Sequence, residues 1–336
     1  MRYVLGIDQG ASKTHALVVD EYGNVSGMGK SRGACHSSNG MEYAMTAVKE
    51  AAGQALAQSG ITIREIEVIA AGMTGIDWDF EGNLLETALC EAFSVKKIKV
   101  VNDCIIAMRA GTSKNYGCVL CAGSGLNCAV RNENAAQIVY GFYIDDEFQG
   151  GYSLGKSTIR AVTDSHIGLK PVTLLTQMLL EYFGVRTVDE ILYRKVTGAI
   201  TPGDYLHLPI ILEEAAARND SVALGMLADY GRNIAMYAVL GMQKLSMLDM
   251  DMDVDVVLSG SIFKCRLPVL REAVSLEIHK YAINAKIVDA VYEPIVGAAL
   301  LGLESLHGEI LPEAYRNLEK SAEKFQIKRV KEGVSE

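Results

Sequence analysis

The sequence predicts an α/β protein of two duplicated domains, each with a mixed sheet, that pack around a cleft. Three observations predict this fold. A pattern of three short strands joined by tight turns opens the chain and recurs after residue 115, and helices alternate with strands after each copy. The chain has 336 residues, 49% of them hydrophobic, which is more than one ordinary core needs. We therefore expect domains at residues 1–115 and 116–336.

The first half of the chain begins with a predicted strand meander over residues 3–7, 14–19 and 24–29, with turn residues between the strands. Apolar residues at helical spacing then predict a helix that contains Met41, Ala44, Met45, Val48 and Ala52. The remaining elements alternate: a strand at 67–71, a helix at 84–93, a strand at 98–101 and a helix from Ile105.

The second half repeats the meander and then becomes more helical. Its predicted strands lie at 116–121, 126–130 and 137–140, and a glycine-rich loop follows them. The later elements are helices at about 173–183 and 221–245, a strand at 254–258, a helix from Pro268, a short strand at Ile287-Val288 and a small-residue segment at 296–302.

The composition argues against several classes of function. A formal net charge of −9 argues against a nucleic-acid backbone as the main partner. Charges or glycines interrupt every apolar run before the roughly 18 residues of a membrane span, and Asp8 lies within the first apolar run, where a secretory signal has no acid. We therefore expect a cytoplasmic protein that does not bind membranes.

The seven cysteines are scattered along the chain. Cys118 and Cys121 have the C-x-x-C spacing, but no second pair follows at the distance of a zinc ribbon. On a strand, their side chains would point to opposite faces. We interpret the cysteines as reduced thiols, with a metal site as the lesser alternative.

Two glycine-containing hairpins occupy equivalent places in the two halves. In the first, Gly10, Ser12, Lys13 and Thr14 offer backbone amides, hydroxyls and a charge to a phosphate, and Asp8 would face Mg²⁺ through water. The second hairpin contains Gly123-Ser124-Gly125. Each hairpin alone is equally well read as an ordinary turn, so the pair carries the prediction of a nucleotide site.

Two further strand ends carry candidate residues. The turn at Gly260 and Ser261, after an apolar strand, would let a flat base lie close to the backbone. Asp103 follows the strand at 98–101 and is our candidate for the base that deprotonates an attacking hydroxyl, because phosphoryl transfer to an alcohol needs a carboxylate there. The alternative for Asp103 is a helix cap.

The segment from Gly150 to Ser157 fits the P-loop pattern G-x-x-x-x-G-K-[ST] letter for letter. Its context is wrong, because an acidic loop at 145–149 precedes it where a P-loop needs a buried strand. Acids beside a triphosphate would also repel it. We therefore interpret the match as a coincidence.

Taken in order, these elements resemble the N-acetylglucosamine kinases and the BadF/BadG/BcrA/BcrD-type ATPases, within the superfamily of sugar kinases, actin and heat-shock ATPases. The similarity runs from Tyr3 to about Leu303 and is most specific in the first hairpin, the Val-Val-Asn-Asp strand end at 100–103, the turn at 258–263 and the segment 294–300. The resemblance implies two ribonuclease-H-like domains that close over ATP and a sugar.

The resemblance also implies roles for individual residues. Ser12 and Ser124 correspond to hydroxyls that hold phosphate, Gly260 lies near the adenosine, and Asp103 is the base. On the sugar side, the stretch from Tyr140 to Glu147 is similar to the family's sugar-binding segment. The substrate residues expected from the family pattern are His36, Asn39, Asp77, Gly141, Asp146 and Glu147.

The substrate end departs from the family pattern. Asp145 replaces a glycine, and Phe148-Gln149 interrupt the usual Gly-Ser after the acidic pair. The loop is therefore one residue longer than in the family pattern. His36 stands about where an Asn commonly touches the sugar, with Asn39 close by. A satisfied surface histidine is the alternative for His36.

The first hypothesis is an ATP- and Mg²⁺-dependent kinase that phosphorylates a sugar hydroxyl, most specifically of N-acetylglucosamine or a related amino sugar, and that forms a homodimer. The second is an ATPase that regulates a partner protein; members of that kind carry a cysteine-ligated iron–sulfur cluster at a dimer interface. Cys104 and Cys128 are the cysteines nearest to a plausible interface, and they form no convincing ligand pair. The third is a sugar-binding protein without turnover.

Overall fold

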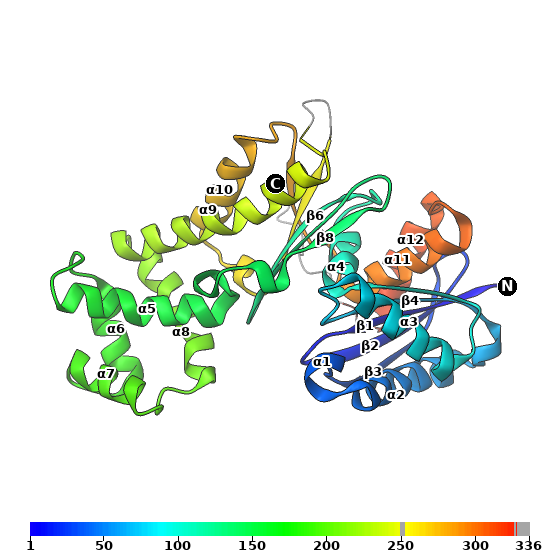
Figure 1. The fold of residues 1–336 in the computed structure, drawn as a ribbon, viewed down its shortest axis with the longest axis horizontal. Coiled ribbons are helices and arrows are strands. Elements are labelled where there is room, and N and C mark those ends of the chain that lie inside the picture. The colour runs from blue at the N-terminus through cyan, green and yellow to red at the C-terminus, as the bar shows by residue number, and fades with distance from the viewer. Residues whose placement is uncertain (249–252, 326, 328–336) are drawn as a thin grey trace. The chain divides into compact units, whose positions relative to one another are not determined.

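The computed structural model describes residues 1–248, 253–325 and 327, and it contains two five-stranded sheets (Figure 1). The described residues form two compact units. Unit 1 contains residues 1–119, 129–139 and those from 288 onward, and unit 2 contains residues 120–128 and 140–287. The predicted α/β class with two sheets is confirmed. The boundary at residue 115 between the two duplicated domains stays a prediction.

The first sheet has the strand order β3-β2-β1-β4-β5. β1 pairs antiparallel with β2, and β2 with β3, whereas β4 runs parallel to both β1 and β5. The predicted opening meander is therefore confirmed, and each strand is one to three residues longer than the prediction at one or both ends. The strands are β1 Tyr3–Gln9, β2 Lys13–Asp20, β3 Val25–Arg32, β4 Ile66–Met73 and β5 Lys97–Asn102.

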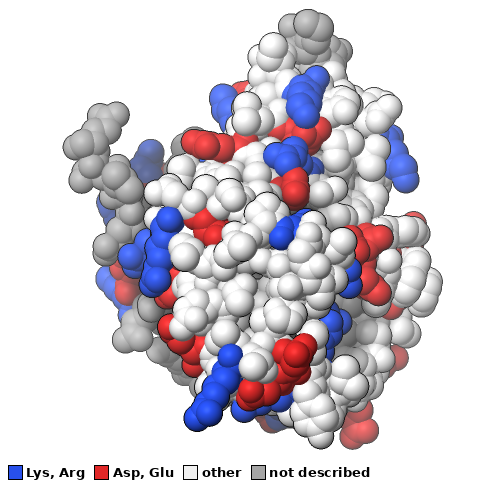
Figure 2. All heavy atoms as spheres, turned by 90° about the vertical axis from the view of Figure 1, so that its left-hand side faces the viewer, with Lys and Arg blue, Asp and Glu red and all other residues white. Residues whose placement is uncertain are grey.

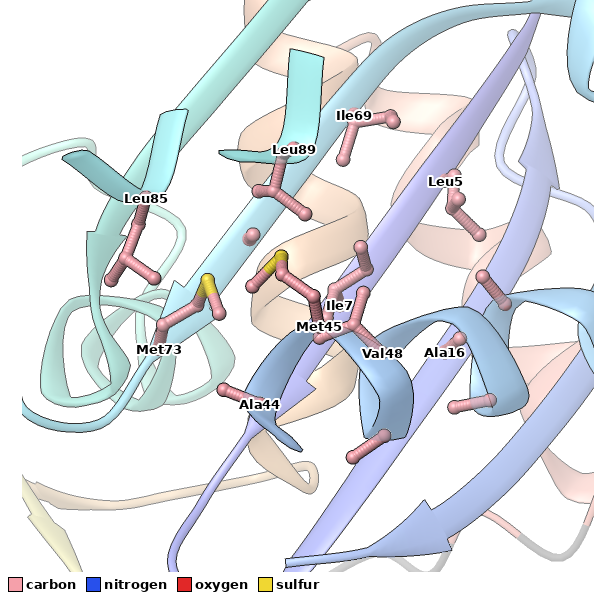
Figure 3. Packing of buried hydrophobic residues seen from close by; sticks show 14 of the residues in the cluster. Leu5, Ile7, Ala16, Ala44, Met45, Val48, Ile69, Met73, Leu85 and Leu89 are labelled. Carbon is pink, nitrogen blue, oxygen red and sulfur yellow. The ribbon is translucent and has the colours of Figure 1, made fainter. Parts of the chain in front are cut away.

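Helices pack on the first sheet and bury alternate side chains of β1. Leu5 and Ile7 belong to the apolar cluster that α2 (Met41–Ser59) and α3 (Asp79–Phe93) complete (Figure 3). Gly6, between them, faces α11 (Pro294–His307), because a Cβ there would lie 2.9 Å from the amide nitrogen of Ala299. The period-two alternation of a strand thus sets both packed faces.

Shorter helices complete unit 1. α4 follows β5 directly and packs against α11. The remaining helices of this unit are α1 His36–Asn39, the 3₁₀ helix η1 Ile63–Glu65, α4 Asp103–Gly111, α12 Pro312–Ala322 and the 3₁₀ helix η5 Glu323–Phe325.

The second sheet has the order β10-β9-β6-β7-β8, and β7 pairs antiparallel with β8. Its predicted strands are all present, with shifts of one or two residues at their ends. They are β6 Gly117–Ala122, β7 Leu126–Arg131, β8 Gln137–Val139, β9 Asp255–Ser259 and β10 Lys286–Asp289.

Unit 2 is more helical than the sequence predicts. Its helices are α5 Gly150–His166, α6 Leu174–Phe183, α7 Val188–Val196, α8 Pro202–Ala217, α9 Ser221–Lys244 and α10 Pro268–His279, with 3₁₀ helices η2 Gly141–Tyr143, η3 Asp146–Phe148 and η4 Ile262–Lys264. The predicted glycine-rich loop is wrong beyond residue 149, because α5 begins at Gly150. Helices α7 and α8 were not predicted from the sequence, and α8 contains an internal proline, Pro209.

On the face shown in Figure 2, which carries helices of unit 2, lysine and arginine side chains are interspersed with aspartate and glutamate. Much of this face is uncharged. Within the described part of the chain, no helix has both the length and the apolar character needed to cross a membrane.

Candidate active site

The carboxyl ends of β1, β4 and β5 lie at one edge of the first sheet, because these three strands are parallel. Asp8 pairs in register with Gly72 of β4, and Gly72 pairs with Val101 of β5. Asp103 follows β5 directly, as the first residue of α4. Ligands of open α/β sheets bind at this kind of edge, and the two predicted carboxylates meet there.

Asp8 is buried, with 6% of its surface exposed. Burial raises its pKa from 3.8 to about 7, and the nearby Asp103 and Glu293 carboxylates add to this rise, while the ammonium of Lys13 opposes it. The charged form of Asp8 therefore lacks compensation from the protein alone.

Asp103 occupies the first position of α4, and Asn102 is the helix cap. The Asn102 side chain accepts a hydrogen bond from the amide of Cys104 at 2.9 Å and donates one to the carbonyl of Ile76 at 2.9 Å. Burial raises the pKa of Asp103 to about 6, against the lowering effect of a hydrogen bond from the backbone of Cys104. The N-cap position is thus filled by Asn102, which leaves Asp103 one residue further into the first turn.

The β1–β2 hairpin exposes the tip that the sequence predicts. The amide of Gly10 donates to the carbonyl of Lys13 at 2.9 Å, and Ser12 and Lys13 are exposed. Gly33 lies against the hairpin: a Cβ on Gly33 would lie 2.5 Å from the carbonyl carbon of Ala11. Thr14 differs from the others: its side chain is buried, and its hydroxyl donates to the carbonyl of Arg32 at 2.7 Å.

Glu293 is a charged residue near Asp8 that was not predicted from the sequence to lie at the site. It precedes α11, and its carboxylate lies 3.5 Å from the Lys13 ammonium and 3.8 Å from Nδ1 of His15. Burial lowers the pKa of His15 to about 4, and Lys13 lowers it further, so His15 is neutral near neutral pH. The pairing with Lys13 joins residues 280 positions apart in sequence, so no local pattern reveals it.

The β4–α3 turn brings Asp77 to the same edge. Asp77 is half-buried, and burial raises its pKa, with Glu81 adding to the rise and His36 opposing it. Asp77 in turn raises the pKa of Asp103. His36 is not a surface histidine: its side chain is 7% exposed and its Nε2 lies 3.3 Å from the carboxylate of Glu81.

Asn39 has a local contact. Its side-chain oxygen accepts a hydrogen bond from the amide of Cys35 at 3.0 Å. Asn39 is exposed at the end of the four-residue helix α1. The described contacts therefore join His36, and not Asn39, to the turn that carries Asp77.

In unit 2, the β6–β7 hairpin packs on the beginning of α5. The amide of Gly151 donates to the carbonyl of Gly123 at 2.8 Å, and that of Tyr152 donates to the carbonyl of Ser124 at 3.1 Å. Gly150 makes this approach possible, because its φ is +68° and a Cβ there would lie 2.6 Å from Cα of Gly125. The hairpin thus uses two of the first amides of α5.

The residues of the P-loop match do not have the conformation of a P-loop. They form the first two turns of a helix, so no loop exists to surround a phosphate. Two of its amides already donate to the hairpin. Lys156 lies with its ammonium 4.5 Å from the centre of the Tyr152 ring.

Gly260 and Ser261 adjoin the same hairpin. Gly260 has a φ of +102°, and a Cβ there would lie 3.0 Å from the amide nitrogen of Ala122. Ser261 lines a cavity of about 300 Å³ with mostly apolar walls, which Leu206, Ile210, Ile262, Cys265 and Glu213 help to form. These walls were not expected from the sequence, because neither α8 nor η4 was predicted.

The segment 141–149 is held by side chains on several sides. The Gln149 amide donates to the carbonyls of Gly141 at 3.2 Å and Ile144 at 2.8 Å. Asn127 accepts from the amide of Gly141 at 2.9 Å, and the Tyr237 hydroxyl accepts from the amide of Asp145 at 3.0 Å. Asp146 and Glu147, both exposed, lie within this fixed segment.

The predicted residues therefore form two groups. Unit 1 brings Asp8, Lys13, Asp77 and Asp103 together, and unit 2 brings the hairpin Gly123-Ser124-Gly125 together with Gly260 and Ser261. Gly141, Asp146 and Glu147 lie on the segment before α5. In the described ranges, no three histidine, cysteine, aspartate or glutamate side chains are arranged to hold a metal ion among themselves.

The fold is that of actin-like sugar kinases. A solved structure from Chromobacterium violaceum, provisionally described as an N-acetylglucosamine kinase, matches with a TM-score of 0.64 over 90% of this chain and 99% of that chain. At 19% sequence identity, this likeness concerns the fold alone. The model of the BadF/BadG/BcrA/BcrD ATPase family matches residues 5–302, and the chain belongs to this family.

Two curated relatives of this chain are named as amino-sugar kinases. The chain is 26% identical over 251 residues to an N-acetylmuramic acid/N-acetylglucosamine kinase of Clostridium acetobutylicum, which covers 74% of this chain and 81% of that protein. It is 26% identical over 319 residues to an N-acetyl-D-glucosamine kinase of Dictyostelium discoideum, which covers 90% of this chain and 98% of that protein.

Proposed function

We propose that this protein is an ATP-dependent kinase that phosphorylates a hydroxyl of N-acetylglucosamine or a related amino sugar. The observation that carries the proposal is the pair of carboxylates at the carboxyl edge of the first sheet: Asp8, which is buried, and Asp103, which is partly exposed. The kinase names of the curated relatives support the same reaction and the same class of acceptor.

In the proposed reaction, Asp103 is the general base. Its carboxylate accepts the proton of the sugar hydroxyl as the new bond between that oxygen and the γ-phosphorus forms. The bond from the γ-phosphorus to the β,γ-bridging oxygen breaks, and ADP leaves. A pKa of about 6 suits this role, because the carboxyl is mostly ionised near neutral pH and is still basic enough to take the proton.

We further propose that the two glycine hairpins contribute to nucleotide binding. Ser12 and Lys13 offer donors to phosphate on the exposed tip of the first hairpin, and Ser124 has the equivalent place in the second. The predicted amide donor of Gly10 is already used, because it donates to the carbonyl of Lys13. Thr14 is left out, since its hydroxyl donates to the carbonyl of Arg32. When ATP binds, its phosphates would compete with Glu293 for Lys13.

The cavity beside Ser261 supports a place for the adenosine part of ATP. Its volume of about 300 Å³ and its apolar walls are typical of a site for a flat, partly apolar ligand. The carboxylate of Glu213 adds a hydrogen-bond acceptor to the wall, although it already accepts from the amide of Arg266 at 2.7 Å.

The carboxyl edge of the first sheet, where Asp8 lies, also fits Mg²⁺. Asp8 is a buried carboxylate whose pKa is raised by burial and by the nearby Asp103 charge, and Mg²⁺ commonly binds through one or two carboxylates plus waters and phosphate oxygens. Asp8 would hold the ion, which supplies neutralising charge to the β- and γ-phosphates. Because Mg²⁺ usually keeps several waters and phosphate oxygens as ligands, Asp8 would need no further protein ligand there.

The test is a coupled ADP-release assay with a panel of amino sugars and hexoses, together with mass spectrometry of the product. A phosphorylated amino sugar is the expected product. ATP hydrolysis that leaves every sugar unmodified would contradict the kinase and favour an ATPase that acts on a partner.

A variant pair tests the base. Asp103→Asn should lower turnover by at least about a hundredfold, which is the usual range for general-base catalysis, while ATP affinity measured by calorimetry stays close to that of the wild type. Asp189→Asn, at an exposed aspartate of α7, is the matched control and should leave turnover unchanged. Normal turnover by Asp103→Asn would exclude Asp103 as the base.

A further inference from the structure

Glu81 is a buried carboxylate that the proposed reaction does not use. It lies in the first turn of α3, and 5% of its surface is exposed. One carboxylate oxygen, Oε2, accepts hydrogen bonds from the amides of Asp77 at 2.8 Å and Trp78 at 3.1 Å. The other, Oε1, lies 3.3 Å from Nε2 of His36. Glu81 therefore joins His36 to the backbone of Asp77.

The ordinary explanation of a glutamate at this position is a helix cap. A glutamate in the first turn commonly accepts the amide that precedes the helix. The chain contains such a residue in Glu65, which accepts from the amide of Thr62 at 2.8 Å and is exposed. Capping therefore requires neither burial nor a buried histidine partner, and Glu81 has both.

The cost of burial points in the same direction. A carboxylate removed from water is expensive unless it is paired, and the neighbouring Asp77 adds a second negative charge. The pair with His36 is itself buried, at 7% exposure for each side chain. Within the described residues, Nδ1 of His36 has no hydrogen-bond partner. A cap alone would not need this arrangement.

The turn that Glu81 holds is tightly packed. Gly75 has a φ of +82°, and a Cβ there would lie 2.6 Å from Sγ of Cys35 and 3.3 Å from Cε1 of His36. The turn also lines a small cavity of about 180 Å³, which has Asp77, Trp78 and Asn83 in its wall. Within this packed turn, the Glu81 carboxylate accepts the backbone amide of Asp77.

We propose that Glu81, supported by His36, is a positioning residue for the acceptor sugar: it fixes the backbone of Asp77 so that the Asp77 carboxylate can bind sugar hydroxyls beside Asp103. This inference rests on the proposed kinase function. It gives His36 an indirect role, through Glu81, in place of a direct contact with the sugar.

The test separates positioning from a general loss of folded enzyme. Glu81→Ala removes the acceptor of both amides and should raise KM for the sugar about tenfold, which corresponds to the loss of an ordinary hydrogen bond. KM for ATP should not change. A variant that merely folds less well would lower kcat and leave both KM values as they are, because fewer molecules would be active.

Two further variants sharpen the test. Glu81→Gln keeps an oxygen that can accept both amides and should restore most of the sugar affinity. Glu91→Ala, at an exposed glutamate of the same helix, is the matched control and should behave as the wild type. In a double-mutant cycle, His36→Ala and Glu81→Ala should raise the sugar KM less together than the product of their separate effects.

The outcomes distinguish this inference from the kinase proposal. An unchanged sugar KM in Glu81→Ala, or equal effects of the two substitutions at Glu81, would overturn the positioning role while the kinase stands. If the wild type transfers no phosphate, sugar affinity measured by calorimetry decides: a tenfold loss in Glu81→Ala supports positioning, and a wild type that binds no sugar overturns both.

Discussion

Gly297→Ala is the substitution whose effect follows most directly from the packing. Gly297 lies in α11, at its contact with α4, the helix that carries Asp103. A Cβ at this position would lie 2.8 Å from the carbonyl carbon of Ile106 and 2.9 Å from the amide nitrogen of Ala110. Both neighbours are backbone atoms, so a change of side-chain rotamer cannot relieve the overlap.

The magnitude follows from ordinary contact distances. Carbon atoms pack at about 3.5–4.0 Å, so the two helices must separate by at least about 0.7 Å. Overpacking of this kind costs about 1–3 kcal/mol, occasionally more. This cost outweighs the gain of up to about 1 kcal/mol that alanine brings to a helix. A displacement of Asp103 by this distance should also lower kcat on the order of tenfold.

The assay is urea unfolding followed by circular dichroism, together with the sugar-kinase assay. Gly53→Ala is the matched control: Gly53 lies in α2, and a Cβ there would meet no atom within 4 Å. We expect this control to gain up to about 1 kcal/mol and to keep full activity. The two glycine-to-alanine changes should therefore have opposite signs.

If Gly297→Ala unfolds at the same urea concentration as the wild type and keeps its kcat, then the close approach of α11 to α4 does not limit either stability or the placement of Asp103.

Three further predictions concern charge and the cavity. The pKa of Asp8 rises on folding from 3.8 to about 7, so stability that is present below about pH 4 is lost as the pH rises through about 7. Asp8→Asn has no carboxyl to ionise, so its free energy of unfolding at about pH 8 in EDTA should exceed that of the wild type by up to about 4 kcal/mol. Urea unfolding that shows the same difference between the two proteins near pH 4 would contradict this. Glu304→Ala leaves the buried guanidinium groups of Arg109 and Arg131, now 3.4 and 3.8 Å from its carboxylate, without that partner, and it should cost about 3–5 kcal/mol of unfolding free energy. A loss below about 1 kcal/mol would mean that this carboxylate does not compensate them. Ile210→Glu places a charge in the wall of the cavity beside Ser261 at a side chain that is 51% exposed, so it should weaken ATP binding measured by calorimetry at least about tenfold with little change in unfolding; unchanged ATP affinity would remove the cavity from the nucleotide site.

Local patterns predict the part of the fold that local forces determine. The strands of the first meander are visible because apolar alternation and turn residues mark each strand and each turn. Asp8 and Asp103 are found for the same reason, since each lies at a marked strand end. The helix at 150–166 is missed because it opens with Gly150-Gly151, which a sequence reader assigns to a loop. The structure shows that Gly150 serves the close approach to the hairpin at Gly125.

Contacts between distant residues are beyond this kind of prediction. Lys13 and Glu293 pair across most of the chain, and nothing in either local sequence indicates the partner. His36 and Glu81 are a milder case: each looks like a surface residue by type, and only the packing of the short segment after β3 against the β4–α3 turn makes them a buried pair. The composition of a site is thus partly predictable, whereas its supporting contacts are not.

The carboxyl edge of the first sheet holds several carboxylates close together, which is unfavourable for stability. Asp8 and Asp103 raise each other's free energy when both are ionised, and Asp77 and Glu293 add to the repulsion. A fold selected for stability alone would replace at least one of them, since an uncompensated buried charge is costly. The repulsion has a use if a cation and a proton-donating substrate bind there, because both relieve it. Asp8 and Asp103, which the sequence marks as chemical, are therefore carboxylates whose ionised forms the unliganded fold disfavours.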